Sequence, residues 1–257
     1  MRILIKIFDF YIQSSIHVAF AVFCLLQITV VSNQQQLNNH YSFCVFFGTV
    51  LGYNFLKYFE YLKKKNIWNK KYFTIIGVSA LAGFGFLFSF YFLQHAVQLL
   101  LLISGLFVLV YTFLRKYGWF KLFFVSFVVT FITVYIPFQT TKWLPLDFYI
   151  NIIQRFLILI SLLIPFEIMD SKTDDKSLNT LPQLFGIEST KLFGILLIIP
   201  FIILEFLKLH PSYLVLPIGI ITVTFINFTE WNRNQYYTSF WVESVPILWW
   251  LMLVFLQ

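Results

Sequence analysis

Nine apolar segments, each long enough to cross a bilayer, constrain this chain more than any other feature. A helix needs about 20 residues to span roughly 30 Å of hydrocarbon. The segments lie at about 14–32, 41–61, 72–93, 96–114, 119–137, 148–166, 187–207, 212–228 and 241–256. They lack the period-2 alternation and turn signals of barrel strands. The sequence therefore predicts an all-α fold, a polytopic transmembrane helical bundle of about nine helices.

The composition and the segments between the apolar stretches agree with an integral membrane protein. Only 11% of the 257 residues are charged, against roughly a quarter in soluble domains. The first apolar segment is followed by polar SNQQQLNN without a small-residue cleavage pattern, so we expect a retained first span rather than a removed signal peptide. The loops are short and no linker is evident, which predicts one membrane-embedded domain over residues 1–257.

Basic residues set the expected orientation. With a cytoplasmic N-terminus, fifteen of the 18 Lys and Arg residues fall on the cytoplasmic side, Lys142 and Lys208 fall on the other, and Arg155 lies inside a span. Cytoplasmic loops carry such an excess of positive charge. The net charge of +7 then faces anionic lipid head groups or diphosphate esters. No motif indicates nucleic acid as a partner.

The segment PFEIMDSKTDDKSLNTLPQLFG, residues 165–186, contains the candidate functional residues on this cytoplasmic side. It holds four of the 11 acidic residues. If the helix continues past Phe166, then Glu167, Asp170 and Asp174 share one face at i, i+3 and i+7. Mg²⁺ binds through one or two carboxylates and completes its shell with water and phosphates, so a divalent cation here would turn the repulsion between these carboxylates into coordination. The competing interpretation is a solvated acidic loop.

The same segment resembles the second aspartate-rich motif of the UbiA superfamily of intramembrane prenyltransferases, close to DxRDxxxDxxxGxxTLPxxxG. The residues that match in order are Glu167, Asp170, Asp174, Thr180, Leu181, Pro182 and Gly186. The stretch from Tyr111 resembles the family's Y-x-x-x-K/R-R/K signature, with Arg115 and Lys116 at its basic positions. A nine-helix bundle with both motif loops on the cytoplasmic side is also similar to the family's architecture.

The resemblance implies a function and a set of site residues. It implies a Mg²⁺-dependent transfer or binding of an isoprenoid diphosphate in a lipid-open cavity, in a multi-pass protein of a bacterial inner membrane. Glu167, Asp170 and Asp174 would be metal ligands, and the two aspartates would carry catalysis. The residues that would bind substrate are Asn54, Tyr111, Arg115 and Lys116.

The first aspartate motif departs from the family pattern. It would begin at Asn54, where Tyr58 and Leu62 stand in place of aspartates and Glu60 is the acidic residue nearby. This favours an alternative, in which the protein is a catalytically inactive relative that acts as a lipid-binding or partner-docking scaffold. Asn54 then has a simpler role as one end of a hydrogen bond between helices.

One basic residue lies inside a span. Arg155 precedes Glu167 by 12 residues, or roughly 18 Å of helix, and therefore belongs to the outer half of the bundle. Ionisable residues within spans are costly and have partners. Glu205 lies near the outer end of the next span, so we expect a structural Arg155–Glu205 ion pair, with an anion site as the alternative.

Overall fold

The computed structural model describes residues 2–63, 70–114, 116–139 and 146–256, and these residues form helices joined by short connections. The α-helices are α1 (Arg2–Gln13), α2 (Ile16–Ser32), α3 (Asn39–Lys63), α4 (Lys70–Tyr91), α5 (His95–Leu114), α6 (Gly118–Thr130), α7 (Ile136–Phe138), α8 (Leu146–Asp170), α9 (Leu181–Phe185), α10 (Ile187–Glu205), α11 (Val215–Asn227) and α12 (Val245–Leu256). The π-helices η1 (Phe131–Tyr135) and η3 (Tyr237–Val242) and the 3-10 turn η2 (Lys176–Leu178) complete them.

Each of the nine expected spans coincides with helical segments of this structure, and the all-α prediction is confirmed. By length and apolarity, six helices of the described residues can cross a membrane, or seven when the bent pair α1 and α2 is one span. The α11 helix has only 13 residues, and α3 carries more polar side chains along its 25 residues. The chain is a multi-pass integral membrane protein.

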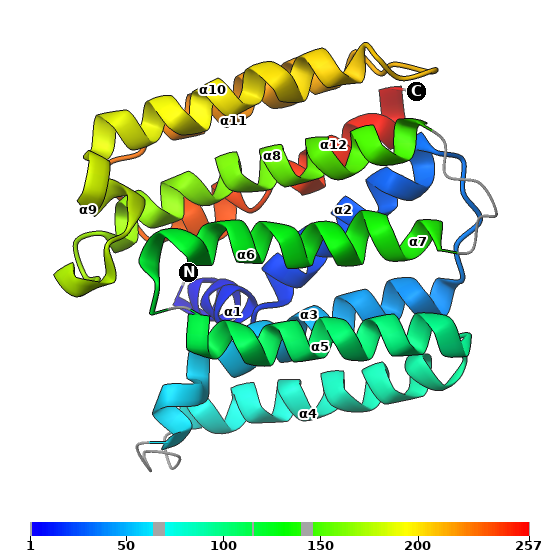
Figure 1. Cartoon of the computed structure of the whole chain (residues 1–257). Helices are drawn as coiled ribbons and strands as arrows, with labels where there is room; N and C mark the ends of the chain where they lie inside the picture. The colour runs from blue at the N-terminus through cyan, green and yellow to red at the C-terminus, as the bar shows by residue number, and fades with distance from the viewer. Residues whose placement is uncertain (1, 64–69, 115, 140–145, 257) are drawn as a thin grey trace.

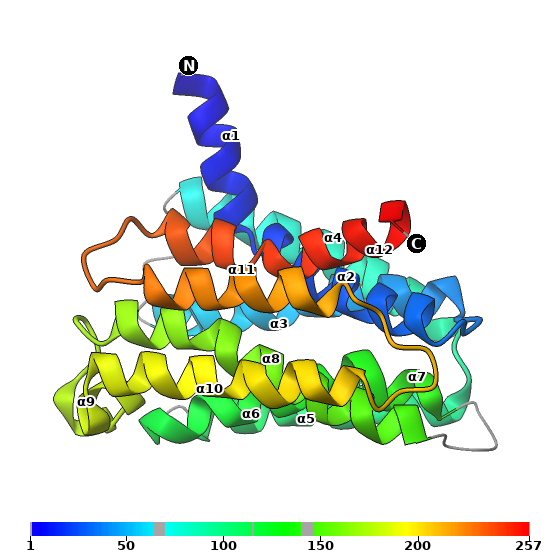
Figure 2. The same cartoon turned by 90° about the horizontal axis from the view of Figure 1, so that it is seen from above.

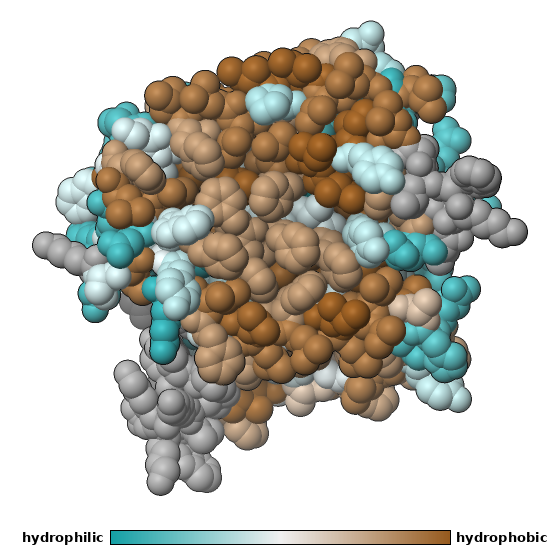
Figure 3. All heavy atoms as spheres, in the orientation of Figure 1, coloured by the Kyte–Doolittle hydropathy of each residue, from teal (hydrophilic) through white to brown (hydrophobic). Residues whose placement is uncertain are grey.

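The long helices lie side by side along one direction, with α10, α8 and α6 in successive rows from the top of Figure 1. Seen from above, the α1 helix projects away from the other helices (Figure 2). Figure 3 shows hydrophobic side chains over the middle of one face and hydrophilic ones towards its two ends. Those two ends correspond to the two membrane surfaces, because helices that cross the bilayer run from one polar end to the other.

The α8 helix is the central element of the bundle. Of its most apolar window, 61% is buried inside the protein, against 17% for α4 and for α5. It packs mainly against α10, where a Cβ on Gly194 would lie 3.0 Å from Ile164 Cγ1. At the same crossing, the Ser161 hydroxyl donates to the Gly194 carbonyl over 2.9 Å. A larger residue at position 194 would require the Ile164 side chain to shift.

The π-helix η1 interrupts the span between Gly118 and Phe138 without ending it. A wide turn leaves backbone carbonyls without their ordinary helical donors, and the Tyr41 hydroxyl of α3 donates to the Ile132 carbonyl over 2.6 Å. Tyr41 is buried in the main hydrophobic core, together with Leu26, Ile158 and Phe201. The partner that satisfies this distorted turn therefore comes from another helix.

Candidate functional site

The acidic segment begins where α8 ends. The helix stops at Asp170, so the predicted helical face through Asp174 is not formed, and this prediction was wrong. Instead the chain turns back: the amides of Thr173 and Asp174 both donate to the Asp170 carbonyl, over 2.9 and 2.8 Å. The Ser171 and Thr173 hydroxyls bond to the backbone of this turn as well. Short polar side chains of this kind compete with helical hydrogen bonds.

A lysine from another helix joins two of the carboxylates. The Lys121 amine, in the first turn of α6, lies 3.1 Å from Glu167 Oε1 and 3.2 Å from Asp174 Oδ2. All three side chains are largely buried, with exposed fractions of 15%, 8% and 21%. An ammonium in this position removes the repulsion between the two carboxylates. From the sequence, Lys121 is one of the fifteen basic residues expected on the cytoplasmic side.

One oxygen of the buried Glu167 carboxylate is not used by this pairing. Glu167 Oε2 makes no hydrogen bond with the described residues, although a buried carboxylate oxygen without a partner costs free energy. Asp170, one helical turn further on, is exposed. An unpaired buried oxygen and a neighbouring exposed carboxylate can together receive a cation from the end of the bundle.

The magnesium prediction can be compared with this donor set. Within the described part of the chain, no group of three or more His, Cys, Asp or Glu side chains could hold a metal ion. Mg²⁺ needs only one or two protein carboxylates when substrate phosphates supply other ligands, and Glu167 Oε2 and Asp170 meet that requirement. The donor set therefore fits a metal that binds together with a phosphate ester, and Mg²⁺ remains a prediction.

The loop after α8 has a defined shape held by its own side chains. Asp175 Oδ1 accepts from the Ser177 amide over 3.0 Å, and this hydrogen bond lowers the pKa of the Asp175 carboxyl. Gln183 Oε1 accepts from the Thr180 amide over 3.0 Å, which caps the short helix α9. The backbone of Asn179 is left-handed, with a φ of +55°, a conformation that Asn tolerates better than most residues.

A glycine lets this loop lie against α6. A Cβ on Gly118 would stand 2.4 Å from the Leu178 carbonyl oxygen and 2.9 Å from the Thr180 amide nitrogen. Only a residue without a side chain permits this approach. Because Lys121 lies one turn after Gly118, the same contact brings its amine to Asp174.

Two of the predicted substrate-binding residues, Asn54 and Tyr111, each contact a neighbouring helix. Asn54 of α3 is buried and its amide donates to Ser79 Oγ of α4 over 3.0 Å, which is the hydrogen bond between helices expected as its simpler role. The Tyr111 ring of α5 stacks on Phe124 of α6 at 6.3 Å. Lys116 is exposed directly after α5, and Arg115 lies outside the described residues. Their roles in substrate binding remain predictions.

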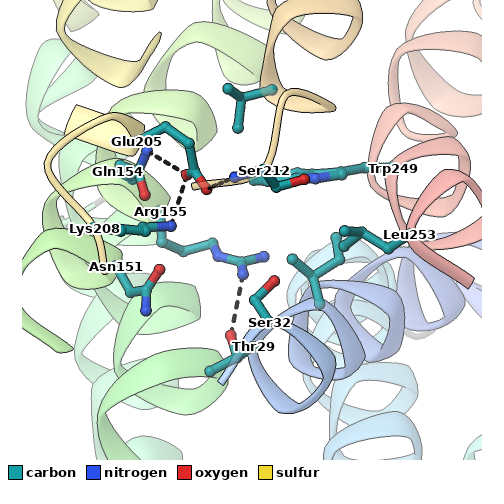
Figure 4. Close-up of a pocket in the computed structure, with 12 residues that line it drawn as sticks. Thr29, Ser32, Asn151, Gln154, Arg155, Glu205, Lys208, Ser212, Trp249 and Leu253 are labelled. Atoms are coloured by element: carbon teal, nitrogen blue, oxygen red, sulfur yellow. Dashed lines mark hydrogen bonds and ion pairs between the residues drawn. The ribbon is translucent and has the colours of Figure 1, made fainter. Parts of the chain in front are cut away.

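A second polar cluster lies nearer the start of α8, away from Asp170 (Figure 4). Glu205 does not pair with Arg155: its Oε2 accepts from Lys208 Nζ over 2.7 Å and from Gln154 Nε2 over 3.0 Å, and its Oε1 accepts from the Ser212 amide over 2.9 Å. The expected Arg155–Glu205 ion pair was wrong. Lys208 takes the place of Arg155 because it lies one helical turn from Glu205, where side chains meet most readily.

Comparison with known proteins gives a structural relative and no sequence relative. No protein-family model and no curated protein matches the chain. A solved structure of digeranylgeranylglyceryl phosphate synthase, a UbiA-superfamily intramembrane prenyltransferase, is similar at a TM-score of 0.56 and 16% sequence identity. The match covers 97% of this chain and 96% of that chain. An identity this low informs on the fold alone, so this protein shares the fold of that synthase over nearly its whole length, in agreement with the UbiA-like bundle predicted from the sequence.

Proposed function

We propose that this protein binds an isoprenoid diphosphate, with Mg²⁺, at the cytoplasmic end of α8, as a member of the prenyltransferase class whose fold it shares. The observation that carries the proposal is the unpaired buried oxygen of Glu167 beside Asp170 and Asp174. A carboxylate buried in this way gains a partner when a cation binds. The name of its structural relative, digeranylgeranylglyceryl phosphate synthase, supports a prenyl substrate.

The residues at this end have distinct roles in the proposal. Glu167, Asp170 and Asp174 hold the metal, which when bound would neutralise charge on the diphosphate. Lys121 keeps Asp174 and Glu167 in place through its two ion pairs. Lys116, exposed after α5, supplies positive charge for the diphosphate. The apolar helices around the site receive the isoprenoid chain and keep water from it.

A specific observation favours a second candidate, a non-catalytic relative that binds lipid or docks a partner. The Lys121 ammonium already compensates two of the acidic side chains, and Tyr58, at a position where the family carries an aspartate, donates its hydroxyl to the Gln13 carbonyl over 2.8 Å. In this candidate the acidic end, formed by Glu167, Asp170 and Asp174, stabilises the bundle and no diphosphate ester is cleaved.

Binding of geranylgeranyl diphosphate to the purified, detergent-solubilised protein tests the proposal. The native chain is compared with the double variant Asp170→Asn, Asp174→Asn, with and without Mg²⁺. We expect Mg²⁺-dependent binding in the native protein and its loss in the variant. Glu188→Gln, which changes a carboxylate that is 87% exposed, is the matched control and keeps native binding.

The outcomes separate the two candidates. Binding that does not depend on Mg²⁺, or that survives the double substitution, contradicts the proposed site. Mg²⁺-dependent binding without release of diphosphate in the presence of candidate acceptors supports the non-catalytic relative. Release of diphosphate that requires Asp170 and Asp174 supports the transferase.

A further inference from the structure

A small cavity in the outer half of the bundle surrounds the Arg155 side chain. Its walls come from α2, α8 and α12, from the end of α10 and from the segment that leads to α11. They include Ser32, Asn151, Glu205, Lys208 and Trp249. Figure 4 shows the Arg155 guanidinium lying among these side chains. Arg155 is 15 residues before Asp170 along α8, roughly 22 Å of helix. The cavity is therefore separate from the acidic end.

The Arg155 guanidinium is buried and only partly paired. Arg155 is 5% exposed. Nη2 donates to Thr29 Oγ1 over 3.1 Å, and the guanidinium carbon lies 5.5 Å from the centre of the Trp249 ring. Nη1 has no hydrogen-bond partner among the described residues. A buried cation with an unused donor and no carboxylate bonded to it costs free energy that an anion would recover.

The nearby carboxylates are committed to other groups. Both oxygens of Glu205 accept hydrogen bonds, from Lys208, Gln154 and the Ser212 amide. Asp147 also attracts the Lys208 ammonium electrostatically. It accepts a hydrogen bond from the Leu209 amide over 3.3 Å and is not part of the cavity wall. The Glu205 carboxylate therefore compensates the charge of Lys208, and the positive charge of Arg155 has no carboxylate partner among the described residues.

The size of the cavity limits what can compensate that charge. It offers about 20 Å³ to the centres of water-sized molecules, room for about one water or one ion of similar size. A water molecule can accept from Nη1, but it brings no charge. Ser32 and Asn151 add polar side chains to the wall, although the Asn151 amide already donates one hydrogen bond to Asn33 Oδ1 over 3.0 Å.

We propose that this cavity is a binding site for one small, singly charged anion of the size of chloride, held by Arg155. The anion bonds to Nη1 and joins α2, α8 and α12 in the outer half of the bundle. It acts on stability at this end and is independent of diphosphate binding at the end of α8.

Anion-dependent unfolding tests this site. The melting temperature of the detergent-solubilised protein is measured in chloride and in gluconate at constant ionic strength, since gluconate is too large for the cavity. We expect a saturable increase of about 3 °C at a chloride concentration ten times Kd. Arg155→Met removes the increase. Arg233→Met is the matched control, because Arg233 also lies over an aromatic ring, 5.6 Å from the centre of Tyr237, but is exposed.

A second measurement uses the native protein, so that the test does not depend on the folding of Arg155→Met. Bromide bound at Nη1 would quench the neighbouring Trp249, and we expect a saturable part of the bromide quenching that Trp249→Phe removes. Quenching that is only linear in bromide overturns the proposal, as does equal stability in chloride and gluconate. Stabilisation by phosphatidylglycerol over phosphatidylcholine, with no effect of chloride, overturns it in favour of a lipid phosphate.

Discussion

At the scale of single residues, Lys121 determines the charge balance at the end of α8. Lys121→Met would leave Glu167 and Asp174 without their cation, and Glu167 is 8% exposed. Removing one partner of a buried ion pair costs about 3 kcal/mol, so we expect a clearly lower melting temperature in detergent. Adding Glu167→Gln removes the stranded charge and should recover much of the loss.

The matched control for Lys121 is Lys191→Met, since Lys191 pairs over 3.3 Å with a Glu188 side chain that is 87% exposed. Exposed pairs contribute less than about 1 kcal/mol. If the two lysine variants melt at the same temperature, the ion pairs of Lys121 with Glu167 and Asp174 do not stabilise the fold.

Asp175 gives the loop after α8 a dependence on pH. The hydrogen bond from the Ser177 amide lowers the pKa of the Asp175 carboxyl below its ordinary value of 3.8. The stabilisation is therefore present above that value and lost as the pH falls through the lowered pKa. Amide exchange at Ser177, corrected for the intrinsic rate, should accelerate over this interval. In Asp175→Asn the amide oxygen still accepts the bond, so the pH dependence should disappear while protection at neutral pH remains.

At the scale of elements, Gly118 sets the distance between α6 and the loop that follows α8. A Cβ there would stand 2.4 Å from the Leu178 carbonyl oxygen, which belongs to the backbone and cannot rotate away. We expect Gly118→Ala to displace the loop and to destabilise the protein by about 1–3 kcal/mol. In Gly105→Ala the new Cβ meets nothing within 4 Å, so this control should gain about 0.5–1 kcal/mol from helix propensity. Equal melting temperatures in the two variants would contradict the close approach.

Helices were predictable from this sequence, while several of their ends and distortions were not. Apolar length alone located α4, α5 and α8, because a span needs a continuous apolar stretch. The end of α8 at Asp170 depends on hydroxyl groups of Ser171 and Thr173 that compete for backbone partners. The π-helix η1 depends on Tyr41, 91 residues away from Ile132 in the sequence. Local patterns carry no information on a partner at that separation.

The candidate site was predictable in its acidic half only. Glu167, Asp170 and Asp174 follow from the spacing and from the resemblance, but Lys121 lies 53 residues before Asp174. A signal was available: Lys121 lies in a stretch that is otherwise apolar, and a cation in a span normally has a partner. A partner was expected for Arg155 for the same reason, and this located the outer polar cluster. The predicted Arg155–Glu205 pair was wrong because the turn after α10 brings Lys208 to Glu205.

At the scale of the whole molecule, the remaining question is which end of the bundle faces the cytoplasm. Fifteen basic residues against two predict that the acidic end and the N-terminus lie on that side. Thr173 in the loop after α8 and His210 after α10 are both exposed and lie at opposite ends of α10. In intact cells, a membrane-impermeant maleimide should modify His210→Cys and leave Thr173→Cys unmodified until the membrane is opened. The native protein is the control, because Cys24 and Cys44 are both buried. Modification of Thr173→Cys alone in intact cells would invert the topology and would place the proposed diphosphate site on the outer surface, away from cytoplasmic substrate.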